Sequence, residues 1–161
     1  MNYNEMKKAL FLDRDGVINI DKNHIYKIKD FEFLDGIFEL CRYFQDLGFI
    51  ILVITNQAGI AKGYYSESDF NKLTNWMIGE FKKRNIVISK VYHCPHHPDF
   101  SNCDCRKPKP GMIFEAFKDY NLDLENSFLF GDKESDLEAG KRAGINNLYL
   151  IKNNKIDFEK K

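Results

Sequence analysis

The sequence has no excess of charge of either sign. Lysine and arginine together number 24, as do aspartate and glutamate, so the formal net charge is zero at pH 7. A chain without net charge has no overall field that would attract nucleic acid or an acidic membrane surface. We therefore expect neither nucleic acid nor a membrane to be a partner.

Long hydrophobic runs are also absent. No apolar stretch approaches the roughly 20 residues that a helix needs to cross a bilayer, and residues 1–8 lack the apolar centre of a signal peptide. These absences predict a cytoplasmic protein. Repeats and low-complexity segments are absent as well, so we expect one domain over residues 1–161, large enough to bury a core, acting as a monomer.

Cysteine is scarce, and its distribution is uneven. Three of the four cysteines, Cys94, Cys103 and Cys105, crowd around His96. In a chain without a signal peptide this crowding favours a metal over disulfides. Ligands one residue apart are closer than in the usual zinc-finger pattern, so the spacing alone leaves redox-active thiols as an alternative. Two further histidines leave the ligand set ambiguous: His93 and His97.

Short apolar runs alternate with segments of helical periodicity. Strands are predicted at 9–12, 49–54, 86–93, 127–130 and 147–151, and helices at 36–47, 66–81, 112–120 and 135–143. Uninterrupted apolar runs suit strands that are buried on both faces of a parallel sheet. The alternation predicts a doubly wound, Rossmann-like α/β fold whose polar loops gather at one edge of the sheet.

The predicted helices carry specific expectations. Ser66, followed by Asp69, is the pattern of a capping box. In the helix at 112–120, the aromatic residues Phe114 and Phe117 are expected to face inward beside Ile113. On the helix at 36–47, one cysteine is expected to be a small buried hydrophobic residue: Cys41.

Two segments carry no regular pattern. Residues 17–35 are mixed and rich in polar residues, and we expect them to form a flap beside the site at the edge of the sheet. The tail from Lys152 onward is polar and is predicted to be frayed.

Polar residues follow four of the predicted strands. Two carboxylates one residue apart repel each other unless a cation or a proton lies between them. A nucleophile, a proton donor and positive charge are what the displacement of a phosphoryl group requires. The strand-end residues that can supply them are Asp13, Asp15, Thr55, Asn56, Lys107 and Asp132.

Each of these residue types suggests a role. Asp13 is the predicted nucleophile, because a carboxylate at the end of a strand is rigidly aimed and can form an aspartyl-phosphate. Asp15 would protonate the leaving oxygen and later take a proton from water. The carboxylates of Asp13 and Asp132 and the backbone carbonyl of Asp15 are oxygen ligands suited to Mg²⁺. Asp136 is expected to orient Lys133 or a metal-bound water.

Four segments, in this order, resemble the haloacid dehalogenase (HAD) superfamily of phosphatases: FLDRDGVIN, ITNQAGIAKG, CRKPKPGM and GDKESD. Within that superfamily the chain resembles the group of D-glycero-D-manno-heptose 1,7-bisphosphate phosphatases, to which histidinol-phosphate phosphatases are close. The resemblance covers residues 8–150 and implies hydrolysis of a small phosphosugar.

The resemblance also assigns positions in this sequence. It implies catalytic roles for Asp13 and Asp15, and Mg²⁺ at Asp13, Asp15 and Asp132. It implies a structural Zn²⁺ held by Cys94, His96, Cys103 and Cys105. The positions that it implies for phosphate and substrate contacts are Asp21, Lys22, Asn23, His24, Thr55, Asn56, Gln57, Arg106, Lys107 and Lys133.

The chain departs from the family pattern in two places. Val17 stands where many members have threonine, and the segment between the pairs of zinc ligands is shorter than usual. Neither usual insertion point has room for a cap domain, so specificity is expected to come from the flap, the zinc loop and Arg106.

The same residues are compatible with two other classes of protein. One is a receiver-like phosphoacceptor signalling domain, and the other is a zinc-binding module without catalysis. A receiver needs a long-lived aspartyl-phosphate, which an acid/base group such as Asp15 beside Asp13 would hydrolyse. Within the enzymes, histidinol-phosphate phosphatase is the alternative.

Overall fold

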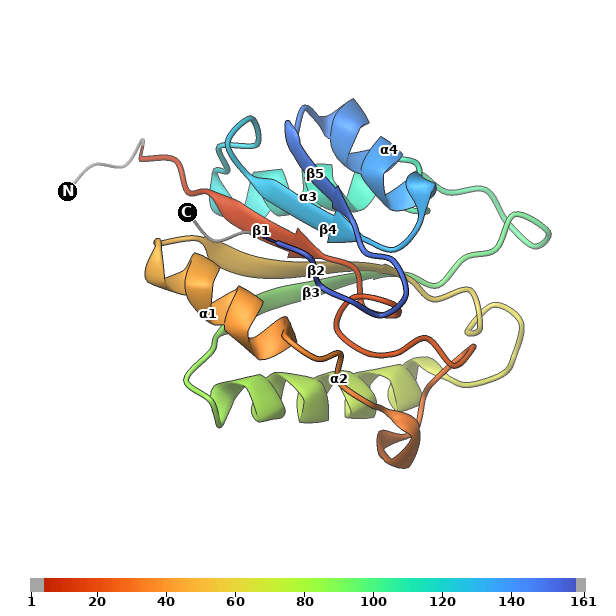
Figure 1. Ribbon diagram of the computed structural model, residues 1–161. Helices are drawn as coiled ribbons and strands as arrows, with labels where there is room; N and C mark the ends of the chain where they lie inside the picture. Colours follow the sequence, from red (N-terminus) through yellow and green to blue (C-terminus); the bar gives the residue numbers. More distant parts are fainter. Residues whose placement is uncertain (1–4, 159–161) are drawn as a thin grey trace.

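All five strands of the central sheet are parallel. The computed structural model describes residues 5–158, and its sheet has the order β3-β2-β1-β4-β5 (Figure 1). The strands are β1 (Ala9–Leu12), β2 (Ile50–Asn56), β3 (Ile88–Cys94), β4 (Phe128–Gly131) and β5 (Asn147–Leu150). The order reverses direction between β1 and β4, which is where open α/β sheets bind ligands. The predicted doubly wound fold is confirmed.

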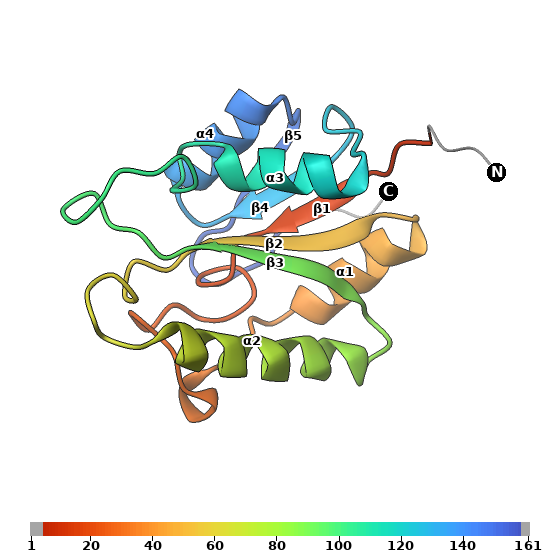
Figure 2. The ribbon, with the colours of Figure 1, turned by 180° about the vertical axis from the view of Figure 1, so that it is seen from behind.

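Helices cover both faces of the sheet. Figures 1 and 2 show α1 (Ile37–Asp46) and α2 (Glu67–Lys82) on one face, and α3 (Gly111–Tyr120) and α4 (Glu134–Ala143) on the other. The predicted helices and strands all form, with ends that shift by one or two residues. Among the helices within residues 5–158, none combines the length and the apolar character that spanning a bilayer requires.

The side chains of β1 alternate between two cores. Leu10 and Leu12 pack in the core beneath α1 and α2, whereas Ala9 and Phe11 pack in the core beneath α3 and α4. All four are fully buried, as expected for the central strand of a sheet covered on both faces. This burial fixes the end of β1, and therefore the residues that follow it.

Several local predictions hold. Ser66 caps α2 by accepting from the backbone N–H of Asp69 at 3.0 Å, and the Asp69 carboxylate accepts from the backbone N–H of Ser66 at 3.0 Å. Cys41 is completely buried in α1.

The predicted inner face of α3 is wrong. Phe114 and Phe117 are 46% and 44% exposed, and the buried residues of this helix are Met112, Ile113 and Ala116. At 3.6 residues per turn, 112, 113 and 116 lie within an arc of about 100° around the helix axis, and 114 and 117 lie to one side of that arc. The small Ala116 brings the helix close to the sheet.

The described part of the tail is not frayed. Phe158 packs against the rings of Phe44, Phe130 and Tyr149, with centroid distances of 5.4, 5.6 and 5.4 Å. Ile156 packs against the same core. The prediction of fraying followed from the polar composition of the tail. It did not take into account that Ile156 and Phe158 are apolar and pack against the core.

The predicted flap and the absence of a cap are both found. The segment between β1 and α1 is an irregular loop with one short 3₁₀ turn, Ile28–Asp30, and the segment between β2 and α2 is a short loop. Neither carries an inserted domain.

Candidate active site

A cavity of about 480 Å³ lies at the carboxyl edge of the sheet. Its wall receives side chains from the ends of β1 and β2, from the flap, from the loop before α3 and from the start of α4. Predicted site residues on this wall are Asp13, Asp15, Asp21, Asn23, His24, Asn56, Gln57, Arg106, Lys107 and Lys133.

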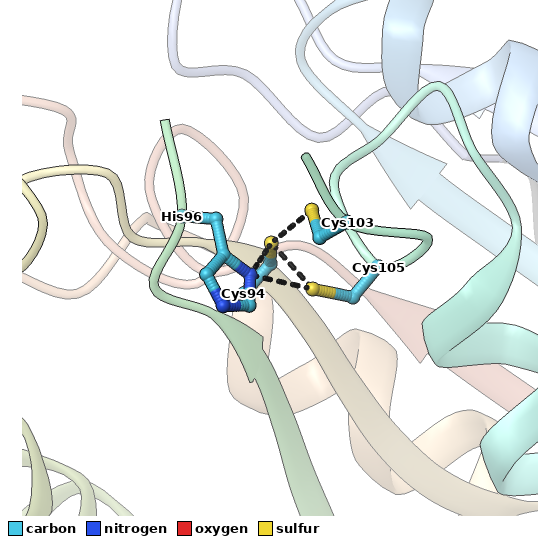
Figure 3. Close-up of side chains that lie close together, drawn as sticks. All are labelled: Cys94, His96, Cys103 and Cys105. Atoms are coloured by element: carbon cyan, nitrogen blue, oxygen red, sulfur yellow. Dashed lines mark hydrogen bonds between the residues drawn. The ribbon is translucent and has the colours of Figure 1, made fainter. Parts of the chain in front are cut away.

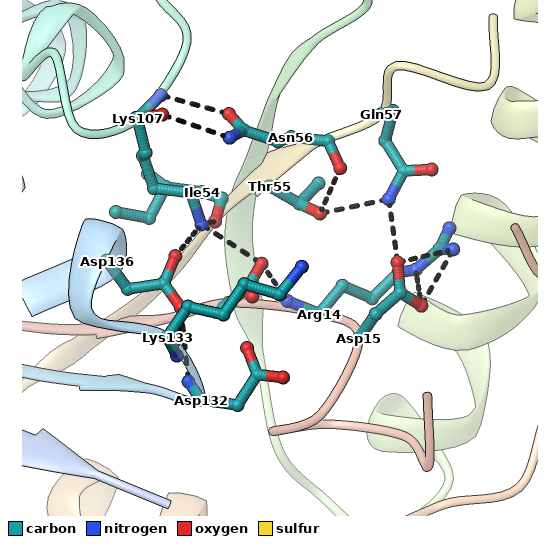
Figure 4. A network of polar contacts seen from close by, with 11 residues as sticks. Arg14, Asp15, Ile54, Thr55, Asn56, Gln57, Lys107, Asp132, Lys133 and Asp136 are labelled. Atoms are coloured by element: carbon teal, nitrogen blue, oxygen red, sulfur yellow. Dashed lines mark hydrogen bonds and ion pairs between the residues drawn. The ribbon is translucent and has the colours of Figure 1, made fainter. Parts of the chain in front are cut away.

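A buried lysine joins the carboxyl ends of β1 and β2 to the start of α4 at the floor of the cavity (Figure 4). Lys107 Nζ lies 3.1 Å from Asp13 Oδ1 and 2.6 Å from Asp136 Oδ1, and it donates to the carbonyl of Ile54 at 2.9 Å. Lys107 is 4% exposed and Asp13 is 8% exposed. Burial opposes the charge on Lys107, but the two carboxylates outweigh it and raise the lysine's pKa. The site therefore holds a permanent positive charge against Asp13.

Three carboxylates crowd together beside that lysine. Oxygen atoms of Asp13, Asp132 and Asp136 all lie within 4.8 Å of one another. Burial, followed by the neighbouring carboxylates, raises the pKa of Asp13 well above its usual value despite the opposing charge of Lys107. Burial and Asp136 raise the pKa of Asp132 to about 6.

One oxygen of this cluster has no protein partner. Asp132 Oδ1 is buried and accepts no hydrogen bond from the described residues. A buried carboxylate oxygen without a donor, next to two more carboxylates, fits a hard divalent cation that takes oxygen ligands. The donor set therefore suits Mg²⁺.

Gly16 allows this crowding. Its φ of +89° lies in the left-handed region, and a Cβ on Gly16 would collide with the carboxylate of Asp132. Both the backbone turn after Asp15 and the approach of β4's Asp132 therefore require glycine here.

Asn56 fixes the backbone of the lysine. Its amide accepts from the backbone N–H of Lys107 at 3.1 Å and donates to the carbonyl of Lys107 at 3.3 Å. The predicted phosphate contact at Asn56 is thus also a clamp between the end of β2 and the loop before α3.

Asp15 is held by a separate set of donors. Arg14 Nη2 lies 3.0 Å from Asp15 Oδ1 and 3.2 Å from Oδ2, Asn19 Nδ2 donates to Oδ1 at 3.0 Å, and Gln57 Nε2 donates to Oδ2 at 3.2 Å. The guanidinium of Arg14 is almost completely buried. The sequence analysis predicts no role for Arg14. Its position between two aspartates is the signal that could have indicated one.

Some predicted site residues lie away from the cavity wall. Lys22 lies in the flap, but its Nζ contacts Glu32 Oε1 at 3.2 Å and is not on the wall. Thr55 is 1% exposed and lies beneath the wall. Asp132 faces a neighbouring cavity next to Gly16. Wall residues for which the sequence predicts no role are Ala58, Lys62, Tyr65, Pro108 and Ser135, and the wall also includes His97 and Asp136.

The expectation that Asp136 orients Lys133 or a metal-bound water holds for the backbone of Lys133, and the metal-bound water remains a prediction. Asp136 Oδ2 accepts from the backbone N–H groups of Asp132 and Lys133, both at 3.1 Å, so it caps the start of α4. Its Oδ1 pairs with Lys107. The contact with Lys133 is to the backbone and does not orient the ammonium group.

The predicted metal-binding loop brings its four ligands together (Figure 3). The ligand atoms of Cys94, His96, Cys103 and Cys105 all lie within 4.8 Å of one another, and His96 Nδ1 is 3.2 Å from Cys105 Sγ. Three thiolates and one imidazole are a donor set typical of structural zinc.

The other two histidines lie outside this group. His93 Nε2 is 2.8 Å from Glu67 Oε2, and the His93 ring stacks on Phe70. His97 Nδ1 accepts from the backbone N–H of Asp99 at 3.1 Å. The ligand set therefore contains one histidine, His96.

The metal-binding loop is tied to the active-site loop. The backbone N–H of Gly111 donates to the carbonyl of Asp104 at 3.1 Å, and a Cβ on Gly111 would collide with that carbonyl. Lys109 Nζ donates to the carbonyl of Cys103 at 2.6 Å. Arg106 and Lys107 lie between these anchored points, so the loop's position sets theirs.

Comparisons with known proteins agree with this geometry. A family described as HAD-hydrolase-like matches residues 104–155. A D-glycero-alpha-D-manno-heptose-1,7-bisphosphate 7-phosphatase of Campylobacter jejuni is 56% identical over 148 residues, which are 92% of this chain and 84% of that protein. A D-glycero-beta-D-manno-heptose-1,7-bisphosphate 7-phosphatase of Helicobacter pylori is 51% identical, over 91% of this chain and 85% of that protein.

A solved structure extends the agreement to the fold. The D,D-heptose 1,7-bisphosphate phosphatase of B. bronchiseptica, complexed with magnesium and phosphate, superimposes with a TM-score of 0.81. It is 32% identical, and the match covers 89% of this chain and 79% of that one.

The parallel sheet and the strand-end carboxylates facing a buried lysine define a phosphoric monoester hydrolase of the HAD superfamily. Its relatives are named for the reaction on heptose bisphosphates. The chain belongs to the family of D-glycero-D-manno-heptose-1,7-bisphosphate 7-phosphatases.

Proposed function

We propose that this chain removes the 7-phosphate of D-glycero-D-manno-heptose 1,7-bisphosphate through a phosphorylated Asp13. The observation that carries the proposal is the pairing of Asp13 with Lys107, 3.1 Å apart, at the floor of a cavity whose rim holds Arg106 and Lys133. A bisphosphate carries two phosphate groups, so its binding requires positive charge both on the floor and on the rim. The names of the relatives support the same substrate.

In the first step, a carboxylate oxygen of Asp13 attacks the phosphorus atom and the bond to the sugar oxygen breaks. Asp15 gives its proton to that oxygen, so the sugar leaves as an alcohol. Lys107 offsets the negative charge of the carboxylate and of the phosphoryl group that approaches it.

In the second step, water attacks the phosphorus atom of the aspartyl-phosphate. Asp15, now deprotonated, takes the proton from that water, and inorganic phosphate leaves with Asp13 restored. A receiver-like domain would keep the phosphoryl group, and the comparisons instead support a hydrolase.

Mg²⁺ is the cofactor that the carboxylate cluster suits. The carboxylates of Asp13 and Asp132 and the backbone carbonyl of Asp15 would hold it, and Asp136 lies within reach of the same cluster. Such an ion supplies positive charge that lowers the repulsion between the attacking carboxylate and the phosphate. Zn²⁺ at the cysteine-rich loop would be closed off by four protein ligands, so its role would be to shape that loop.

A panel of phosphate esters tests the proposal. We expect rapid phosphate release with Mg²⁺ from a heptose 1,7-bisphosphate, with ³¹P NMR showing that the 7-phosphate is lost. Both anomers belong in the panel because the relatives' names include both. Faster release from histidinol phosphate than from either anomer would overturn the substrate and favour the alternative enzyme.

The expectation of a cytoplasmic monomer that acts without nucleic acid or a membrane remains a prediction. The zero net charge is the basis for excluding nucleic acid and an acidic membrane, and the lack of long apolar runs is the basis for expecting the cytoplasm. Sedimentation equilibrium at several protein concentrations tests the oligomeric part directly.

A further inference from the structure

A buried tyrosine reaches the proton-transfer group through one amide. The Tyr65 hydroxyl donates to Gln57 Oε1, and Gln57 Nε2 donates to Asp15 Oδ2 at 3.2 Å and to Thr55 Oγ1 at 2.9 Å. Tyr65 is 6% exposed and Gln57 is 3% exposed. This chain of contacts joins the start of α2 to the end of β1.

The structure gives this amide one orientation, with its nitrogen facing Asp15 and its oxygen facing Tyr65. This orientation suits the ionised form of Asp15, which accepts hydrogen bonds and does not donate them. Burial raises the pKa of Tyr65 to about 12, so its hydroxyl keeps the proton that it donates. Thr55 accepts from Gln57 at 2.9 Å, and its own hydroxyl donates to the carbonyl of Asn56 at 3.5 Å.

The surrounding structure places Tyr65 for this contact. The residue directly precedes Ser66, the N-cap of α2, and its ring stacks on that of Tyr26 with centroids 5.4 Å apart. A Cβ on Gly59 would collide with the tyrosine ring. Glycine at position 59 thus lets the ring approach the loop that follows β2.

Asp15 is gripped from the opposite side by Arg14. The Arg14 side chain also donates from Nη2 to the carbonyl of Ile25 at 2.9 Å, which ties the flap to the same carboxylate. A carboxylate held between a guanidinium and an amide has little freedom to turn away from the cavity.

We propose that Tyr65 is a positioning residue for proton transfer in this enzyme: its hydroxyl locks the Gln57 amide, which holds the Asp15 carboxylate toward the leaving oxygen. The proposal rests on the proposed role of Asp15. It also gives Gln57 a task different from the substrate contact that the family resemblance implies. Tyr65 touches no reacting atom.

Phosphate esters whose leaving groups differ in basicity test the positioning role of Tyr65. An alcohol leaves only with a proton from Asp15, whereas p-nitrophenolate leaves without one. The ratio kcat/KM reports the steps up to formation of the aspartyl-phosphate, so it isolates the donation of that proton. For Tyr65→Phe we expect kcat/KM to fall about tenfold or more on an alkyl phosphate and about twofold or less on p-nitrophenyl phosphate.

A matched control removes the hydroxyl of another tyrosine, Tyr120, which lies at the end of α3. Tyr120 donates to the carbonyl of Ser89 at 3.3 Å, so Tyr120→Phe also loses one hydrogen bond. It should leave both kcat/KM values unchanged. If Tyr65→Phe lowers kcat/KM equally on both substrates, or on neither, the proposed positioning role is wrong.

A double-mutant cycle separates positioning from a loss of folding. Gln57→Met keeps the length of the side chain and removes the amide. If Tyr65 acts through Gln57, adding Tyr65→Phe to Gln57→Met should lower kcat/KM on the alkyl phosphate by less than about twofold further. Fully additive losses would overturn the proposal.

The identity of the substrate does not decide this outcome. Any alkyl phosphate that the wild-type protein hydrolyses serves as the poor leaving group. Failure of the heptose bisphosphate in the substrate panel is therefore distinguishable from failure of the Tyr65 proposal.

Discussion

The floor and the rim of the cavity hold their charges in different ways. On the floor, Lys107, Asp13 and Asp136 are each less than 9% exposed and contact one another directly. On the rim, Arg106 has one hydrogen bond at 3.4 Å, from Nη1 to the carbonyl of His96, and Lys133 is exposed. The floor side chains come from the end of β1, the loop before α3 and the start of α4, and they are fixed by burial and by their ion pairs. We infer that the floor performs the reaction and the rim selects the ester.

The largest expected effect comes from the floor. Asp13→Asn should lower turnover by a factor on the order of 10⁴ or more, because it removes the proposed nucleophile. The asparagine oxygen can still accept from the backbone N–H of Arg14, as Asp13 does at 2.8 Å, so the fold should persist. Steady-state phosphate release and circular dichroism measure the two effects. Substantial turnover by Asp13→Asn, with deamidation excluded by mass spectrometry, would contradict the covalent mechanism.

Lys107→Ala should affect every substrate alike. It removes the charge that faces Asp13 and leaves two buried carboxylates without their lysine. We expect turnover to fall on the order of a hundredfold and unfolding free energy to fall by about 3 kcal/mol, measured by kinetics and urea denaturation.

The control for Lys107→Ala is Lys109→Ala. It removes an exposed lysine that donates to the carbonyl of Cys103, and it should change turnover far less. Similar losses in both variants would mean that general loop disruption explains the Lys107 result.

A variant of the metal-binding loop tests whether the bound metal positions the rim. Cys105→Ser removes a ligand next to Arg106, and misplacement by about 1 Å can cost roughly a hundredfold in rate. We expect a loss of about tenfold to a hundredfold in kcat/KM with a much smaller loss of global stability. Zinc content, measured by atomic absorption, should fall in parallel. A zinc-free variant with normal kinetics would show that the metal does not position the rim.

Arg106→Ala should separate the rim from the floor. Its guanidinium can grip a second phosphate that Lys107, fixed beneath it, cannot reach. We expect about a tenfold loss of preference for a bisphosphate over a monophosphate, where Lys107→Ala leaves that preference unchanged. Equal losses on both substrates would remove the distinction between rim and floor.

The smallest effect concerns pH. The pKa of Asp132 in the folded protein is about 6, above the value of about 3.9 expected for an unfolded chain. The folded state then binds more protons than the unfolded state, so in magnesium-free buffer Tm should decline as pH rises from about 4 through about 6.

Magnesium should oppose this decline. It binds the deprotonated carboxylates, so it should raise Tm more at pH 7.5 than at pH 5. Differential scanning fluorimetry measures both trends. Asp132→Asn should weaken them, and an unchanged pH dependence in that variant would assign the effect to other groups.

The sequence by itself determined the elements and most of the chemistry. Buried strands such as β1 read as continuous apolar runs, and parallel strands bring their carboxyl ends to one edge, so Asp13 and Asp132 were expected at the same edge. The cysteine-rich loop pointed to a metal site, but its spacing left His93 and His97 open as ligands; the family resemblance implied the four residues that the structure brings together.

Only the tertiary structure decided which partners these residues have. Asp15 and Gln57 are 42 residues apart in sequence, and their contact depends on the order of the strands and on how Gly59 admits Tyr65. The pairing of Asp136 with Lys107 likewise arises where α4 begins beside the loop before α3. Local periodicity fixes the faces of helices and strands, but the side-chain contacts between distant segments follow from packing, which no single segment encodes.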